Sequence, residues 1–237
     1  MKRPVSTKKG TRERPERAEK VIVYIDGFNL YFGLKSRRWA RFLWLDLNKM
    51  AQSLLKSNQT LVRVKYFTSR IRLPHDKAAR QNTFLEALET LPNLDIFYGN
   101  YQINKRTCRN CGSIDRVKNE KMTDVNIATE MLTDAFLGKF DTALLISGDG
   151  DLTTPVKRIA ENVGKRVVVV YPPDRRSFAL EKVASAHMSL GRKHLINCQF
   201  PEHVRKANGF YVKPSRSLAE LIPFRFNLGS NYDRFSN

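Results

Sequence analysis

The chain has few of the residues and segments that mark secreted or membrane-spanning proteins. Its 237 residues include only three cysteines, and no apolar run approaches the roughly 20 residues that a membrane span needs. The N-terminus lacks the apolar core of a signal peptide. The cysteines, Cys108, Cys111 and Cys198, are too few and too unevenly spaced for a secreted disulfide framework. We therefore expect a soluble, cytoplasmic protein without a membrane partner.

Acidic residues are also scarce. The chain has 23 Asp and Glu against 42 Lys and Arg, which gives a formal net charge of +19. An excess of this size favours polyanionic partners through long-range attraction and through the release of counterions. Nucleic acid is therefore expected as a partner, ahead of an anionic membrane surface.

Apolar, β-branched runs alternate with helical patterns from residue 21 onward. The patterns predict strands at 21–25, 61–67, 94–99, 142–147 and 166–171, and helices at roughly 46–57, 76–90, 123–137 and 153–163. This alternation predicts an α/β fold with a doubly wound, Rossmann-like parallel sheet of about five to six strands. The runs 144–146 and 167–171 are continuously apolar, as strands covered on both faces should be.

The remaining segments delimit the predicted domain. Residues 1–19 are rich in Lys and Arg and poor in apolar residues, which predicts a disordered basic arm. Residues 20–200 are expected to form the domain itself. Within it, 100–121 breaks the alternation and is predicted to be a basic insertion or long loop that contains a pair of cysteines. Residues 201–237 have weak periodicity and scattered aromatics, which predicts a peripheral C-terminal extension.

Four aspartates fall where the predicted sheet would bring them to one edge. Asp26 ends the first strand, Asp124 opens a helix, and Asp149 and Asp151 follow the strand 142–147. In an open parallel sheet the carboxyl ends of the strands converge, and ligands bind where the strand order reverses. Clustered carboxylates repel one another unless a cation lies between them. The pattern therefore predicts a divalent metal site.

Ordinary structural roles are an alternative for each of these residues. An aspartate such as Asp124 is common in a first helical turn, where the helix dipole favours its ionised form, and Asp151 could only begin a helix. Asn29 could orient a carboxylate or bind substrate, or it could be a capping residue that follows Asp26. Ser147 could hydrogen-bond the same cluster. The joint placement of the acids at one edge favours a site over four separate structural roles.

The four aspartates lie in three sequence blocks, residues 23–30, 120–128 and 145–152. In this order and spacing they resemble the NYN domain family of PIN-like, metal-dependent ribonucleases, over about residues 20–200. The resemblance implies a PIN-like sheet and a Mg²⁺ or Mn²⁺ site formed by Asp26, Asp124, Asp149 and Asp151, with Asn29 as a supporting residue. Glu130, where similar sequences often have Asp, faces away from the site by helix geometry and is left out of it.

The resemblance implies a metal-dependent nuclease, a hydrolase that cleaves RNA phosphodiester bonds with water as the nucleophile. DNA stays open as a substrate. The alternatives are a non-catalytic RNA-binding or scaffold module and a phosphohydrolase of small phosphate esters. Phosphate contacts are expected from Lys105, Arg106, Arg109, Arg116, Lys118, Lys121, Arg175 and Arg176.

Aromatic and cysteine residues leave further alternatives open. Tyr31, Phe32, Trp39 and Trp44 could stack on unpaired bases, or they could be core residues.

The pair Cys108 and Cys111 resembles half of a zinc knuckle. A zinc site needs four ligands and only Cys198 remains, so a site of cysteines alone cannot form within one chain. A histidine, or the cysteine pair of a second chain in a homo-oligomer, could complete a Zn²⁺ site. A reduced surface hairpin is the alternative.

Overall fold

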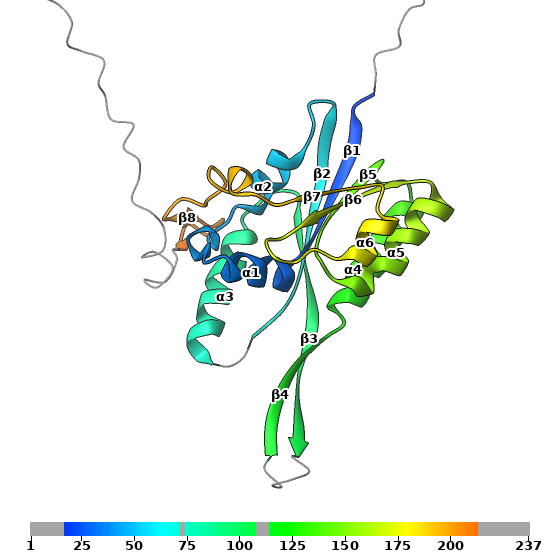
Figure 1. The fold of residues 1–237 in the computed structure, drawn as a ribbon. Coiled ribbons are helices and arrows are strands. Elements are labelled where there is room, and N and C mark those ends of the chain that lie inside the picture. Colours follow the sequence, from blue (N-terminus) through cyan, green and yellow to red (C-terminus); the bar gives the residue numbers. More distant parts are fainter. Residues whose placement is uncertain (1–16, 72–73, 108–113, 213–237) are drawn as a thin grey trace, which may run out of the picture.

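The computed structural model describes residues 17–71, 74–107 and 114–212. A seven-stranded sheet forms its centre, with the strand order β4-β3-β2-β1-β5-β6-β7 (Figure 1). The strands are β1 Glu19–Asp26, β2 Gln59–Ser69, β3 Leu94–Thr107, β4 Ile114–Lys121, β5 Thr142–Ile146, β6 Arg166–Tyr171 and β7 Ala186–Ser189. All neighbouring strands are parallel except β3 and β4. The predicted α/β fold is confirmed, with six parallel strands and one antiparallel edge strand.

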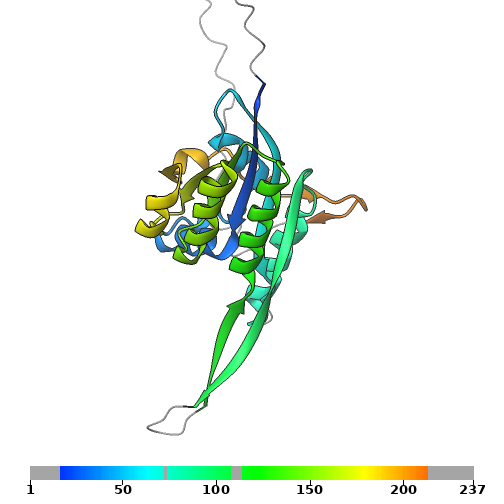
Figure 2. The same ribbon diagram turned by 90° about the vertical axis from the view of Figure 1, so that its right-hand side faces the viewer.

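Helices cover both faces of the sheet (Figures 1 and 2). One face packs against α1 Gly27–Ser36, α2 Leu47–Leu54 and α3 His75–Leu88, and the other against α4 Thr123–Phe136, α5 Thr153–Arg158 and α6 Phe178–Val183. Successive side chains of a strand point to opposite faces. In β1, accordingly, Val21, Val23 and Ile25 belong to the first core and Ile22 and Tyr24 to the second. This two-sided burial explains the continuous apolar runs in the central strands.

The described residues of the segment 100–121 form two long antiparallel strands, the β3–β4 hairpin, whereas the sequence predicted an insertion or loop. β3 continues to Thr107, and β4 returns antiparallel to it, with Asn100 opposite Lys121. Figures 1 and 2 show the hairpin projecting from the body of the domain, beyond the carboxyl ends of the neighbouring strands. Polar and charged residues dominate both strands of the ribbon. The segment therefore lacks the apolar runs by which the central strands were predicted.

The C-terminal part of the described chain packs beside α3. Two short strands, β8 Val204–Arg205 and β9 Tyr211–Val212, form a hairpin that contacts α3. Val204 and Val212 belong to the first core, whereas Phe210, one of the aromatics of this extension, is 72% exposed. Aliphatic residues rather than this aromatic therefore attach the extension to the domain.

Two predicted segments lie largely outside the described residues, namely the arm 1–19 and the part of the extension from 213 to 237. The last residue of the predicted arm, Glu19, begins β1. Along the portions of the chain that the structure describes, none of the helices has the length and apolar character to cross a bilayer.

A buried cluster of charges attaches α4 to the sheet. The Lys65 ammonium group on β2 lies 2.6 Å from Glu130 Oε2 and 2.5 Å from Asp134 Oδ2, and the Tyr24 hydroxyl donates a 2.7 Å hydrogen bond to the same Asp134 oxygen. Burial alone would raise the pKa of Asp134, but the hydrogen bonds from Lys65, Tyr24 and Lys139 outweigh it and hold the pKa below its ordinary value. Glu130 thus serves the attachment of the helix, away from the predicted metal site.

Candidate metal centre

The strand order reverses between β1 and β5. From β1 the chain continues to β2 and β3 on one side, and α4 then returns it to β5, β6 and β7 on the other. Open α/β sheets bind ligands in the crevice at such a reversal. Three of the predicted residues lie here: Asp26 is the last residue of β1, Asp124 lies in the first turn of α4, and Asp149 follows β5.

The carboxylates of these three aspartates come together. Asp26, Asp124 and Asp149 each offer one oxygen, and the three oxygens lie within 4.8 Å of one another. Burial, followed by the negative charges of Asp149, Asp26 and Asp151, raises the pKa of Asp124 to about 6. The pKa of Asp124 is therefore raised, whereas the helix dipole alone would favour its ionised form. A hard divalent cation among the oxygens would relieve the repulsion, so the donor set fits Mg²⁺ or Mn²⁺.

Hydrogen bonds connect the β1 end with the loop after β5. Asp26 Oδ1 accepts a 3.0 Å bond from the Asn29 backbone N–H, which caps α1, and Asp26 Oδ2 accepts a 3.0 Å bond from the Ser147 hydroxyl. Ser147 Oγ accepts the Asp149 N–H at 3.0 Å, and Asn29 Oδ1 accepts the Gly148 N–H at 3.1 Å. Asn29 and Ser147 therefore position the backbone and the carboxylate of Asp26.

Glycines permit two close approaches at this edge of the sheet. A Cβ on Gly148 would lie 1.5 Å from the carbonyl oxygen of Arg175. A Cβ on Gly27 would lie 2.6 Å from the ring of Tyr66. Any side chain at either position would force neighbouring backbone or ring atoms to move. The close packing at Gly148 holds the Arg175 segment against the acidic edge.

An open cavity of about 160 Å³ lies at the aspartates. Phe28, Phe32, Met122 and Arg175 contribute to its wall, and the Arg175 guanidinium lies 5.9 Å from the centre of the Phe32 ring. Met122 has a left-handed φ of 75°, which is uncommon for a residue with a side chain. It is the N-cap of α4, and Thr123 is the first helical residue. Phe28 and Met122 were missed because only their proximity to the acidic motifs singles them out.

Two further predicted residues lie apart from this group. Asp151 is exposed, and its backbone N–H donates a 3.0 Å bond to Asp149 Oδ1. Its carboxylate is not one of the three grouped oxygens, although its charge contributes to the raised pKa of Asp124. The Arg176 guanidinium makes two hydrogen bonds to Glu181, at 2.9 and 2.6 Å, and therefore lies against α6.

Of the other predicted phosphate contacts, Lys105 and Arg106 lie on β3, and Arg116, Lys118 and Lys121 lie on β4. The strand register places Lys105 opposite Arg116, and β4 ends at Lys121, directly before Met122 and α4. Arg109 and the pair Cys108 and Cys111 lie outside the described residues, so a Zn²⁺ site there stays a prediction.

The fold and the acidic cluster define an α/β protein with a candidate metal site at the topological switch point of its sheet. The family model for the NYN domain matches residues 20–191, and the chain belongs to this family. The family resemblance noted in the sequence motifs is thereby confirmed, and NYN domains belong to the PIN-like ribonuclease superfamily.

The chain is similar to one known protein in sequence and to another in structure. The protein named 6-hydroxy-3-succinoylpyridine 3-monooxygenase HspA, from Pseudomonas putida (strain DSM 28022 / S16), is 27% identical in a 220-residue alignment. The match covers 76% of this chain and 69% of that protein. A solved structure of a protein of unknown function, VPA0982, from Vibrio parahaemolyticus RIMD 2210633, has a TM-score of 0.53 at 19% identity. That match covers 76% of this chain and 97% of the other and supports the fold alone.

Proposed function

We propose that the protein is a metal-dependent ribonuclease that hydrolyses RNA phosphodiester bonds with water as the nucleophile. The observation that carries the proposal is the group of three carboxylates, Asp26, Asp124 and Asp149, whose oxygens lie within 4.8 Å of one another at the switch point. Asp151, in the next turn, and Asn29 complete the proposed catalytic set. Membership of the NYN family supports nuclease chemistry in general.

The proposed division of labour follows from the contacts. Mg²⁺ or Mn²⁺ at the three carboxylates would supply Lewis acidity to the phosphate and would lower the pKa of water. Ser147 and Asn29 hold the Asp26 carboxylate and the loop after β5 in place. Hydrolysis joins the water oxygen to phosphorus, breaks the bond from phosphorus to the leaving oxygen, and transfers a proton to that oxygen. Arg175, in the wall of the cavity, would balance the charge of a neighbouring phosphate.

The β3–β4 hairpin is the proposed arm for phosphate contacts. It projects from the sheet beyond the body of the domain (Figure 2), and β4 ends directly before α4, whose first turn contains Asp124. Its strands carry Lys105 opposite Arg116 and Ile103 opposite Lys118. A ribbon with this many cations would follow a polyanion and release its counterions.

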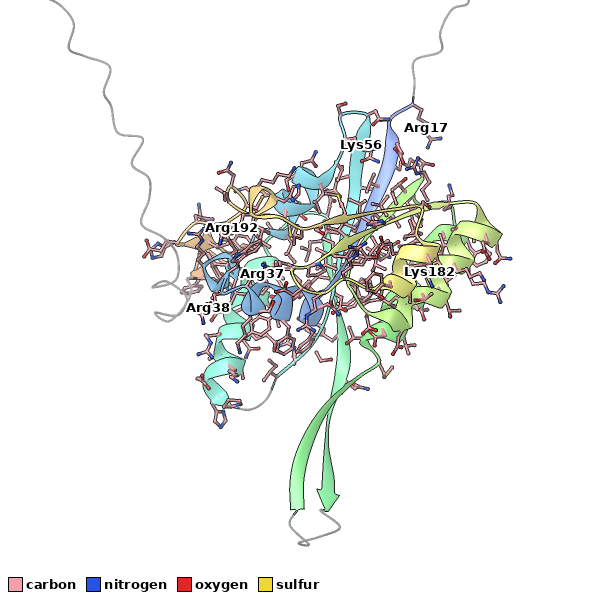
Figure 3. All side chains as sticks on the ribbon, in the orientation of Figure 1. Arg17, Arg37, Arg38, Lys56, Lys182 and Arg192 are labelled. Atoms are coloured by element: carbon pink, nitrogen blue, oxygen red, sulfur yellow. The ribbon has the colours of Figure 1, made fainter. Side chains whose placement is uncertain are left out.

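Positive charge elsewhere is distributed around the molecule. In Figure 3, Arg17 and Lys56 lie at the end of the sheet where β1 begins, Arg37 lies beside α1, and Lys182 lies on α6. Arg37 is also neutralised in part by Asp174, at 2.7 Å. We therefore assign these residues a general attraction for nucleic acid and assign docking to the hairpin and Arg175.

A cleavage assay tests the proposal. Purified protein is incubated with labelled single-stranded RNA in Mg²⁺, in Mn²⁺ and in EDTA, and cleavage is expected only with metal. Asp149→Asn should reduce the rate by more than about 100-fold because it removes a metal ligand. Asp95→Asn, in an exposed pair with Arg63, is the matched control and should cleave normally.

The assay also separates the alternatives. Full cleavage by folded Asp149→Asn would remove the assigned site. Intact RNA with every metal would favour the non-catalytic binding module. Hydrolysis of a mononucleotide ester without any action on RNA would favour the small-ester phosphohydrolase.

The name of the Pseudomonas putida relative raises a second candidate function, oxidation of a small heteroaromatic compound. The observation in its favour is a mainly apolar cavity of about 330 Å³ beside the acidic site. Oxygen uptake on addition of 6-hydroxy-3-succinoylpyridine and an electron donor would support this candidate, and absence of uptake would remove it.

A further inference from the structure

A second cavity lies beside the candidate metal centre. Its volume is about 330 Å³, and residues of α1, α3 and the 3₁₀ turn Ala40–Phe42 line it. Phe28 and Phe32 line both this cavity and the acidic cavity. The two cavities are thus neighbours, with the aromatic side chains of α1 between them. A volume in this range suits part of a small ligand rather than a protein segment.

Flat aromatic surfaces dominate the shared wall. The Phe28 and Phe32 rings lie 6.2 Å apart at an interplanar angle of 28°, and Tyr31 meets Phe32 edge-on at 5.2 Å. Phe32 is 44% exposed and Tyr31 is 39% exposed. By contrast, Trp44, which was also considered for base stacking, is buried and donates its indole N–H to the Pro201 carbonyl. Tyr31 and Phe32 of α1 therefore offer exposed ring surface to a ligand.

The opposite wall is held in place by hydrogen bonds. Gln81 on α3 accepts a 2.7 Å bond from the Ile71 N–H and donates a 3.0 Å bond to the Ser69 carbonyl. Its amide is therefore fixed in the lining of the cavity, between α3 and the end of β2. Apolar walls with a few fixed polar groups are typical of preformed ligand sites.

Cations border the aromatic wall on both sides. Lys35 lies in the lining of the larger cavity, with its Nζ 5.9 Å from the centre of the Tyr31 ring. Lys77 also lines that cavity and is exposed. On the side of the aspartates, Arg175 lies over Phe32. A flat apolar ring joined to a negatively charged phosphate has the shape and charge that match these surfaces.

We propose that the larger cavity holds an unpaired nucleobase of the RNA whose neighbouring phosphate lies at the three aspartates; this inference rests on the nuclease function proposed above. The base stacks on Phe28 and Phe32, and the phosphates on either side meet Lys35 and Arg175. A base inside a duplex is stacked and paired, so it must leave the duplex before it can enter such a cavity. The substrate class is therefore RNA with unpaired nucleotides.

Binding without metal tests the inference separately from cleavage. The full chain is titrated in EDTA with fluorescein-labelled single-stranded RNAs, each lacking the base at one position. The wild type should bind roughly tenfold more weakly to RNAs that lack the base at one or two adjacent positions, as expected for the loss of one stacked base. Phe32→Ala should bind intact RNA roughly tenfold more weakly and should no longer respond to the missing base at those positions.

Two variants provide controls. Phe32→Tyr keeps a ring at the site and should restore the response to the missing base. Phe136→Ala removes a phenylalanine that is 70% exposed at the far end of α4, and it should bind every RNA as wild type does.

Identical profiles for wild type and Phe32→Ala would overturn the inference, as would equal affinity for duplex and single-stranded RNA. Cleavage without base dependence would contradict the cavity assignment but leave the nuclease proposal intact. Base dependence without cleavage in the separate metal assay would contradict the nuclease proposal and leave base binding intact. Binding of free 6-hydroxy-3-succinoylpyridine together with flat RNA profiles would also overturn the inference, in favour of a small-molecule site.

Discussion

Helix α4 carries an acidic residue near each end, and the two have opposite surroundings. Near the C-terminal end, Asp134 is buried, contacts Lys65 at 2.5 Å and has a pKa below its ordinary value. At the N-terminal end, Asp124 faces Asp26 and Asp149, and burial together with their charges raises its pKa to about 6. The first cluster contains its own cation, whereas the second gathers negative charge. Acids of the first kind serve the fold, and those of the second kind favour binding of a cation.

The largest change in the free energy of unfolding is expected from breaking the buried charge cluster of Lys65, Glu130 and Asp134. Lys65→Met removes the buried ammonium group and leaves Asp134 and Glu130 without their nearest cation. We expect the free energy of unfolding to fall by about 3 to 5 kcal/mol, since one partner of a buried ion pair is left behind. Urea unfolding followed by circular dichroism measures the change.

The matched control for this variant is Lys157→Met, because Lys157 lies 4.0 Å from Glu161 in an exposed pair on α5 and neighbouring turns. It should change stability by less than about 1 kcal/mol. Equal losses in the two lysine variants would show that the cluster on α4 is no more important than a surface pair.

Metal binding at the N-terminal end of α4, beside Asp124, should give the next largest change in the free energy of unfolding. Mg²⁺ or Mn²⁺ at about 100 times its dissociation constant should stabilise the wild type by about 3 kcal/mol, since only the folded state presents the site. Asp149→Asn should lose most of this gain. Thermal unfolding with and without metal measures it, and Asp95→Asn controls for loss of a surface carboxylate. A gain of equal size in Asp149→Asn would place the bound metal elsewhere.

The fold was largely predictable because its central strands and helices have simple patterns. β5 is buried along its whole length, as its continuous apolar run implied, and Gly164 ends the helical segment with a left-handed φ of 69°. α1 escaped prediction because Gly27 and Gly33 lower helix propensity, although both are needed for close packing. α6, β7 and the hairpin escaped because short or polar elements leave no apolar period.

The candidate site was predictable as far as strand ends determine it. The rule that ligands bind at carboxyl ends placed Asp26 and Asp149 at one edge, and the position of Asp124 in the first helical turn brought it to the same edge. In the aromatic wall, Tyr31 and Phe32 were already candidates for base stacking, whereas Phe28 could not be predicted, because its contacts depend on how α1 packs. The pairing of Arg176 with Glu181 likewise depends on the turn between them.

Removing the charge of Asp124 or of Asp134 should change the free energy of unfolding by a smaller amount. The two changes should have opposite signs. The folded pKa of Asp124, about 6, lies above the unfolded value of about 4, so this group stabilises the fold below pH 4 and loses that contribution as pH rises to 6. Without metal, Asp124→Asn should therefore be more stable than wild type above pH 6. After solvent screening is allowed for, we expect about 1 kcal/mol.

Asp134, at the other end of α4, is expected to show the opposite pH dependence. The pKa of Asp134 is lowered, so its charge stabilises the fold above the unfolded pKa, and that contribution is lost as pH falls through the folded value. Asp134→Asn should therefore be less stable than wild type at neutral pH. Urea unfolding in EDTA between pH 4 and 8 measures both variants, and a loss of stability in both at neutral pH would show that the two acids are equivalent.

The smallest change in the free energy of unfolding is expected at Lys139, on the exposed side of the charge cluster around Asp134. Lys139 Nζ lies 2.9 Å from Asp134 Oδ1, but its side chain is 50% exposed. Water and salt screen this contact, so Lys139→Met should lower the free energy of unfolding by much less than Lys65→Met does, and by less still in high salt. Urea unfolding at low and high salt, beside Lys65→Met, measures the difference. A loss as large as that of Lys65→Met would mean that Asp134 needs both cations, so that the stabilising charge pair extends to the surface.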